Sequence, residues 1–219
     1  MKPRLLFAHG WALDRSLWDG VLAALGDDAR DAIVLDAGYY GRPVNSPAID
    51  PARPLLGVGQ SLGALELLTA PPAPLAGLVV LDGFARFAAT ADFPQGVPLR
   101  VLQLMKRRLG ADPQAVAAES LTRALAGQRT GGQVNRETLA QGLDRLMTLD
   151  GRAAALELAI WRLHASNDPV ADPAAADASF AGARVIADVR REAADHLSPI
   201  TAPGACARLI RAAVQALST

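Results

Sequence analysis

Short apolar runs alternate with longer helix-forming segments along most of the chain. The runs that predict strands lie at residues 4–8, 32–36, 55–58, 77–81, 159–163 and 183–187. Each run is short enough for a buried strand, and the segments between the runs carry helix-forming residues. A regular alternation of this kind is typical of a mainly parallel sheet with helices on both faces. The pattern therefore predicts an α/β fold built on about six strands.

One interval breaks this alternation. Residues 93–151 contain no run that predicts a strand, but helical segments are predicted at residues 99–109, 113–126 and 136–149. We expect residues 93–151 to form a helical cap, inserted in a core made of residues 1–92 and 152–219. A cap of this kind can line a pocket with apolar side chains, although the same side chains could simply pack on the core. The candidates are Leu102, Met105, Leu121 and Leu143.

Composition adds limits to this picture. The chain has 219 residues, 51% of them hydrophobic, and its 22 basic residues balance 22 acidic ones. This length supports one sizeable core, and the balanced charge gives no field that would attract nucleic acid or a membrane surface. The single cysteine, Cys206, excludes an intramolecular disulfide. The first apolar stretch is too short for a signal peptide, so we expect a cytoplasmic protein.

Candidate chemistry begins at Ser61. This residue is the centre of Gly59-Gln60-Ser61-Leu62-Gly63, which stands between a predicted strand and the helix-forming residues 64–68. A G-x-S-x-G pattern in this context is typical of a nucleophile elbow, where glycines let strand and helix approach closely. An ordinary glycine-bounded turn would give the same five letters. The interpretation therefore depends on whether the chain also supplies a base, an acid and an oxyanion hole.

A base and an acid follow Ser61 in the expected order. Of the three histidines, His196 lies in a polar loop after the last predicted strand, which is where a hydrolase with this elbow carries its base. His164 ends an apolar segment and is interpreted as structural. Asp168 lies just beyond the penultimate predicted strand, between Ser61 and His196 in the chain, and is the favoured acid. Asp82, at the end of an earlier predicted strand, remains a second candidate.

The loop after the first predicted strand is the candidate oxyanion hole. It reads His9-Gly10-Trp11, and we expect the backbone N–H of Trp11 to act together with that of Leu62. Two such donors stabilise the negative oxygen that forms when a serine attacks an acyl group. The side chain of His9 is expected to brace the loop by hydrogen bonding.

These motifs together resemble the α/β-hydrolase superfamily over essentially the whole chain. Within it, the chain is most similar to the pimeloyl-acyl-carrier-protein methyl ester esterases of biotin synthesis. That closer resemblance rests on residues 9–18, on Ala85-Arg86-Phe87 and on residues 92–97. Two positions depart from the usual pattern: Gln60 stands where histidine or tryptophan is more usual, and residues 36–43 replace a common Asp-Leu-Pro-Gly-x-Gly loop.

The resemblance implies a serine carboxylic-ester hydrolase that needs no cofactor or metal. Its substrate would be a small acyl ester, which the resemblance implies could be attached to acyl carrier protein, and the residues expected near that ester are His9, Trp11, Tyr39, Tyr40 and Phe87. Basic residues of the cap would receive the acidic carrier, unless they only form a solvated helix face; they are Lys106, Arg107, Arg108, Arg123, Arg129 and Arg136.

Two other functions remain open at this point. A general carboxylesterase, a thioesterase or a carbon-carbon bond hydrolase of the same fold would share every triad feature. A catalytically silent member of the fold could instead bind a ligand or a partner protein, although such a module has no need of an intact Ser61, Asp168 and His196.

Overall fold

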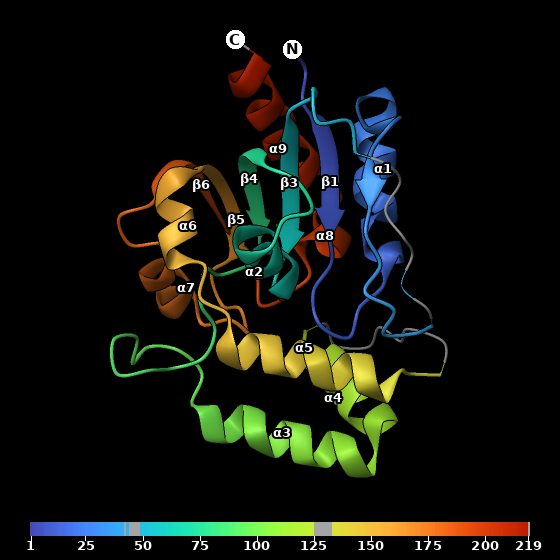
Figure 1. Cartoon of the computed structure of the whole chain (residues 1–219), viewed down its shortest axis with the longest axis vertical. Helices are drawn as coiled ribbons and strands as arrows, with labels where there is room; N and C mark the ends of the chain where they lie inside the picture. The colour runs from blue at the N-terminus through green and yellow to red at the C-terminus, as the bar shows by residue number, and fades with distance from the viewer. Residues whose placement is uncertain (42, 44–48, 125–132, 219) are drawn as a thin grey trace.

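The centre of the protein is a parallel sheet. The computed structural model describes residues 1–219 except 42, 44–48, 125–132 and 219, and its sheet has the order β2-β1-β3-β4-β5-β6 (Figure 1). All neighbouring strands in it run parallel. The prediction of an α/β fold with a mainly parallel sheet of about six strands is confirmed. The strands are β1 (Arg4–Ala8), β2 (Ile33–Val34), β3 (Leu55–Gln60), β4 (Leu75–Leu81), β5 (Ala159–Ala165) and β6 (Arg184–Arg191).

Strand ends differ from the prediction mainly at the two edges of the sheet. The β2 strand keeps two residues of the predicted five, whereas β6 runs on to Arg191, beyond the predicted end at residue 187. Most of β6 is exposed or half-buried and carries charged side chains such as Asp188 and Arg190. An edge strand pairs on one side only and need not be apolar, so hydrophobicity gives little sign of where it stops.

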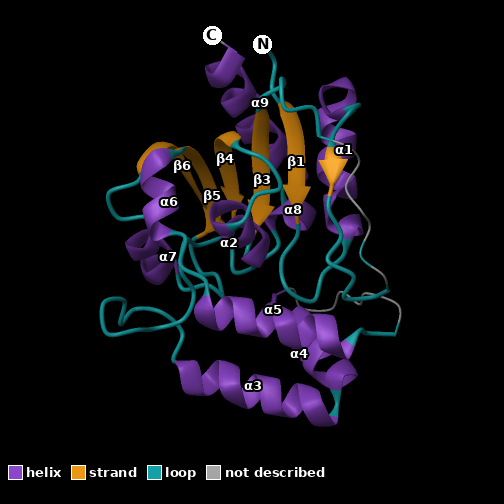
Figure 2. Cartoon of the chain, viewed as in Figure 1, coloured by secondary structure: helices purple, strands orange, loops and turns teal. Residues whose placement is uncertain are grey.

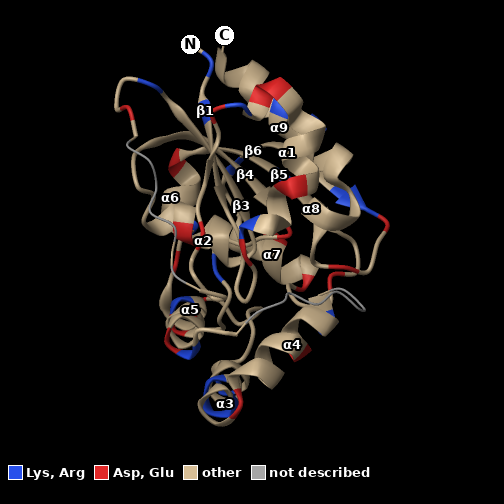
Figure 3. Cartoon of the chain, turned by 90° about the vertical axis from the view of Figure 1, so that its right-hand side faces the viewer, with Lys and Arg blue, Asp and Glu red and all other residues tan. Residues whose placement is uncertain are grey.

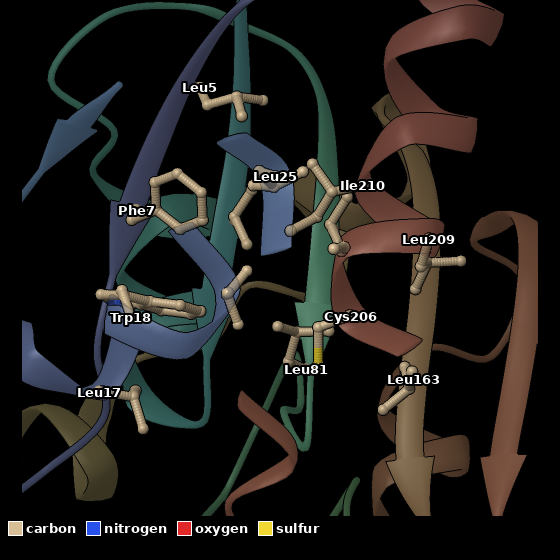
Figure 4. Packing of buried hydrophobic residues seen from close by; sticks show 14 of the residues in the cluster. Leu5, Phe7, Leu17, Trp18, Leu25, Leu81, Leu163, Cys206, Leu209 and Ile210 are labelled. Carbon is tan, nitrogen blue, oxygen red and sulfur yellow. The ribbon is translucent and has the colours of Figure 1, made fainter. Parts of the chain in front are cut away.

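Helices cover both faces of the sheet (Figure 2). Along β1, Leu5 and Phe7 belong to one core cluster and Leu6 and Ala8 to another, as the alternation of side chains along a strand requires. The first cluster is covered by α1 (Asp19–Leu25) and α9 (Pro203–Ser218), which pack against each other and contribute Leu25, Cys206 and Ile210 (Figure 4). The second cluster is covered by α2 (Leu62–Thr69) and α6 (Arg152–Glu157).

Shorter elements complete the core. They are the 3₁₀ helices η1 (Arg15–Trp18) and η2 (Gly26–Ala29), together with α7 (Pro173–Ser179) and α8 (Ser198–Thr201). None of the helices in the described part of the chain is both long enough and apolar enough to cross a lipid bilayer.

Three further helices lie beyond the carboxyl ends of the strands (Figure 1). They are α3 (Leu99–Ala111), α4 (Pro113–Ala124) and α5 (Arg136–Thr148), which match the predicted helical segments to within a few residues. The last two residues of the predicted segment 113–126 lie outside the described residues. A third apolar cluster joins these helices to the sheet domain, and it contains Trp11, Leu62, Leu139 and Leu143. We propose that this helical layer is the cap.

Candidate active site

Ser61 occupies a tight turn between β3 and α2. Its backbone has φ of 52° and ψ of −123°, a conformation that L-residues rarely adopt. Strain of this kind is concentrated at functional sites because surrounding structure must hold it in place. Gly63 allows the close packing, since a Cβ atom there would lie 2.1 Å from the carbonyl oxygen of Ala8. The turn thus holds the Ser61 side chain at the carboxyl end of the sheet.

Ser61, His196 and Asp168 form one hydrogen-bonded chain. The Nε2 atom of His196 lies 2.8 Å from the Ser61 hydroxyl oxygen, and its Nδ1 lies 2.6 Å from Oδ2 of Asp168. The other oxygen of Asp168 accepts hydrogen bonds from the backbone N–H groups of Val170 and Ala171, at 2.8 and 2.9 Å. All three side chains are buried. The arrangement is that of a hydroxyl next to a general base whose far side faces a carboxylate.

The environment of His196 suits a general base. Burial alone would lower the pKa of this imidazole, but the charge and hydrogen bond of Asp168, together with the charges of Asp82 and Asp195, outweigh burial and leave the pKa raised. Asp168 is also the acceptor that fixes the proton of the neutral ring on Nδ1. Nε2 is then free to accept the proton of Ser61.

Asp82, the second candidate for the acid, makes different contacts. This residue follows β4, and its carboxylate accepts hydrogen bonds from the backbone N–H and the hydroxyl of Ser198, at 2.6 and 2.7 Å. Burial raises the pKa of Asp82 to about 6. Because the oxygens of Asp82 are directed at Ser198, Asp168 is the carboxylate that meets the imidazole of His196.

The His9-Gly10-Trp11 loop passes directly beside the serine. A Cβ atom on Gly10 would lie 2.9 Å from the Cβ of Ser61. The ring of His9 holds this loop in place, because Nδ1 donates to the carbonyl of Gly10 at 2.9 Å and Nε2 accepts from the N–H of Ala37 at 3.1 Å. The backbone N–H groups of Trp11 and Leu62 donate to no acceptor in the part of the chain that the structure describes. Two unpaired donors beside a serine hydroxyl are what an oxyanion hole requires.

A cavity of about 180 Å³ opens above Ser61 and His196. Its walls come from residues 11–13 of the candidate oxyanion loop, from the segments that follow β4, β5 and β6, and from the cap. The apolar side chains among them are Trp11, Leu13, Phe87, Val97, Val101, Leu102, Met105, Leu121, Ala124, Leu146, Val170 and Leu197. A mostly apolar pocket ending at a hydroxyl and an imidazole fits the acyl part of an ester.

Comparisons with known proteins agree with this geometry. No family model matches the chain. A biotin biosynthesis bifunctional protein, BioHC, of Cellvibrio japonicus is 30% identical over 208 residues, which cover 80% of this chain and 40% of that protein. A pimeloyl-[acyl-carrier protein] methyl ester esterase of Nitrosomonas europaea is 27% identical over 204 residues, covering 80% of this chain and 81% of the esterase. The chain thus spans well under half of the first relative and most of the second.

Solved structures give the same fold. An esterase from Thermogutta terrifontis superposes with a TM-score of 0.74 at 19% identity, covering 99% of this chain and 91% of that one. An esterase from Exiguobacterium antarcticum superposes with a TM-score of 0.77 at 14% identity, with coverage of 97% and 92%. The chain therefore has the α/β-hydrolase fold.

Three of the predicted substrate contacts do not line the cavity. His9 braces the oxyanion loop from behind, and the ring of Tyr39 is buried between His9 and Trp11, with ring centroids 5.8 and 6.5 Å away. The hydroxyl of Tyr40 donates to the carbonyl of Ala12 at 3.1 Å. Both tyrosines thus contact residues of the loop after β1, and neither lines the cavity.

The other predicted contacts lie where the cavity is. Trp11 and Phe87 line it, as do the predicted cap residues Leu102, Met105 and Leu121. The fourth predicted cap residue, Leu143, packs in the apolar cluster between cap and sheet domain instead. The indole N–H of Trp11 donates to the carbonyl of Leu139 at 2.8 Å, so this side chain also attaches the cap to the oxyanion loop.

The basic residues of the cap are less available than the sequence indicates. Lys106 pairs with Asp144 and Arg108 with Glu119, each at 2.5 Å. Basic side chains of α3 therefore pair with acidic side chains of α5 and α4, and α5 carries charges of both signs (Figure 3). Arg107 is exposed, and Arg123 stands at the rim of the cavity. Arg129 lies outside the described residues.

A cluster of possible metal ligands lies outside the cavity. Donor atoms of His164, Asp177 and Asp188 are within 4.8 Å of one another. Both oxygens of Asp177 already bind guanidinium groups, those of Arg162 at 2.7 Å and Arg190 at 2.5 Å. Two fixed positive charges would oppose a divalent cation, so this cluster is an ion-pair network between β5, β6 and α7. His164 belongs to this network and not to the cavity.

Proposed function

We propose that the protein is a serine carboxylic-ester hydrolase in which Ser61 attacks, His196 transfers protons and Asp168 orients His196. The observation that carries the proposal is the 2.8 Å contact between the Ser61 hydroxyl and Nε2 of His196. A serine becomes nucleophilic only when a base can take its proton, and a base within hydrogen-bonding distance meets that requirement.

The reaction follows from these roles. His196 takes the proton of Ser61 as the serine oxygen bonds to the ester carbon, and the backbone N–H groups of Trp11 and Leu62 stabilise the resulting oxyanion. When the carbon-oxygen bond to the alcohol breaks, His196 returns the proton to the leaving alcohol. Water, deprotonated by His196, then attacks the acyl-enzyme and releases the acid together with the free serine.

For the natural substrate we propose pimeloyl-acyl-carrier-protein methyl ester, which would be demethylated in biotin synthesis. The printed names of both relatives support this choice, since one is the esterase for that compound and the other a bifunctional protein of biotin synthesis. Arg123 at the cavity and the exposed Arg107 on α3 support it too, because positive charge on the cap would attract an acidic carrier. A carrier-bound substrate would place the enzyme in the cytoplasm.

A general carboxylesterase acting on short acyl esters is the second candidate. It is favoured by the cavity of about 180 Å³ and by the pairing of Lys106 and Arg108 with acidic side chains, which reduces the basic surface open to a carrier. The two candidates share the same chemistry and differ only in whether a carrier protein contributes to recognition.

The experiment compares two substrates and three variants. Ser61→Ala should lose hydrolysis of both p-nitrophenyl butyrate and the carrier-bound methyl ester, and turnover at the wild-type rate would remove Ser61 from the mechanism. Arg107→Glu should slow only the carrier-bound ester at low salt, because a single charge reversal acts through steering. Arg30→Glu is the control, since Arg30 is also exposed but lies at the end of η2, outside the cap. Equal rates for Arg107→Glu and Arg30→Glu on the carrier-bound ester would favour the general esterase.

A further inference from the structure

Gln60, the residue before the nucleophile, has an unusual set of contacts. It is the last residue of β3, and its side chain is completely buried. Its Oε1 atom accepts a hydrogen bond from the backbone N–H of Gly10 at 3.1 Å, and its Nε2 atom donates to the backbone carbonyl of His196 at 2.8 Å. One planar amide therefore joins the oxyanion loop to the loop that carries the base.

Only one orientation of the amide satisfies both contacts. An N–H group needs an acceptor and a carbonyl needs a donor, so Oε1 must face Gly10 and Nε2 must face His196. Gly10 is matched to this arrangement, because a Cβ atom there would lie 2.4 Å from Oε1 of Gln60. Glutamine can join these two loops, which are 186 residues apart in the chain, because its amide carries an acceptor and a donor side by side.

The backbone of His196 is held on its other side as well. Its N–H donates to the carbonyl of Ala124, at the end of α4, with a distance of 3.0 Å. The ring is held by Ser61 and Asp168, and the carbonyl by Gln60. Gln60 therefore joins the backbone of His196 to β3, whereas Ala124 joins it to α4.

We propose that Gln60 is a positioning residue, which sets the oxyanion loop and His196 at their working distances from Ser61 at the same time. Gln60 lines the cavity floor, but its polar atoms are both used in these backbone contacts. Catalysis of this type depends steeply on geometry, and a misplacement of about 1 Å can reduce the rate by about 10²-fold. The inference rests on the proposed function, because it assigns Gln60 a role in hydrolysis by Ser61 and His196.

Two substitutions test the inference. Gln60→Met keeps the length of the side chain and removes both hydrogen bonds, so kcat for p-nitrophenyl butyrate should fall about 10- to 100-fold while KM changes by less than about twofold. Gln60→Glu keeps an acceptor for Gly10 but can donate to the carbonyl of His196 only while the introduced carboxyl is protonated. Its profile of kcat against pH should therefore gain a descending limb at higher pH, which the wild type lacks.

Ser179→Ala is the matched control. Ser179 is buried and makes two hydrogen bonds, from the N–H of Ala85 at 3.0 Å and to the carbonyl of Ala176 at 2.7 Å, but it contacts neither loop. Loss of the Ser179 hydroxyl should lower thermal stability without changing kcat or the pH profile of the folded enzyme. Gln60→Met behaving like Ser179→Ala would overturn the inference, as would a Gln60→Glu profile with the shape of the wild type. Ser61→Ala, assayed alongside, separates the two proposals: activity that survives there removes the proposed function itself.

Discussion

Replacing Asp168 by asparagine separates the two candidate acids, because the structure determines how the new amide must sit. The backbone N–H groups of Val170 and Ala171 both donate to Oδ1 of Asp168, so the single oxygen of the introduced amide has to stay at that position. Its NH₂ group then faces Nδ1 of His196, where Oδ2 now lies at 2.6 Å. An NH₂ group forces Nδ1 to accept, which moves the ring proton to Nε2 and prevents His196 from taking the proton of Ser61.

The expected loss is large. A wrong tautomer in a Ser-His-Asp triad lowers kcat by about 10⁴-fold, which corresponds to roughly 5 kcal/mol of transition-state stabilisation. The assay is steady-state hydrolysis of p-nitrophenyl butyrate by Asp168→Asn and Asp82→Asn, with circular dichroism to establish that both variants are folded. Asp82 contacts Ser198, so Asp82→Asn should keep most of its turnover. Near-normal turnover in Asp168→Asn together with loss in Asp82→Asn would refute this assignment of the acid.

Three further predictions concern pH and pocket size. Because His196 must be neutral to act and its pKa is raised, kcat/KM should fall as the pH is lowered, with a midpoint above the ordinary histidine value of 6.5; a profile without that limb would contradict His196 as the base. Burial raises the pKa of Asp82 from 3.8 to about 6, so ionisation costs the folded state roughly 3 kcal/mol as the pH rises through this window. Asp82→Asn should therefore gain stability relative to the wild type between pH 4 and about 7, as measured by urea unfolding, and a constant difference would contradict the shift. Phe87 and Val97 line both the catalytic cavity and a neighbouring cavity of about 310 Å³, so Phe87→Ala should shift the preferred p-nitrophenyl ester towards longer acyl chains, whereas Leu146→Ala, which lines the catalytic cavity but not this neighbour, should not.

Much of the fold follows from the order of elements along the chain. The apolar runs in the four central strands are buried on both faces, and such strands are the ones that hydrophobicity predicts well. The predicted bounds of the edge strands differ most from the structure. In β6 the reason is that charged side chains lie on a half-exposed edge. The sequence predicts the cap helices to within a few residues because such helices have an apolar face and a polar face, which repeat with the helical period.

For the site, too, the sequence predicts some features and not others. Ser61, Asp168 and His196 could be selected from the sequence because loops at the carboxyl ends of neighbouring parallel strands meet at one edge of the sheet. Contacts within that edge could not be derived, since they depend on side-chain directions that no sequence pattern encodes. The sequence marked Gln60 only as a departure from the usual residue, and its two contacts emerge from the structure. Tyr39 and Tyr40 are predicted near the ester because their segment is expected to lie close to the site. The sequence does not reveal that both side chains contact the oxyanion loop.

The central claim is that His196 makes the hydroxyl of Ser61 nucleophilic, and covalent trapping measures this directly. A fluorophosphonate probe should add to the wild type at one position, which peptide mapping by mass spectrometry would assign to Ser61. Ser61→Ala should take up no probe, and His196→Ala should react far more slowly although it retains the serine. A probe adduct on another residue, or labelling of His196→Ala at the wild-type rate, would contradict the account.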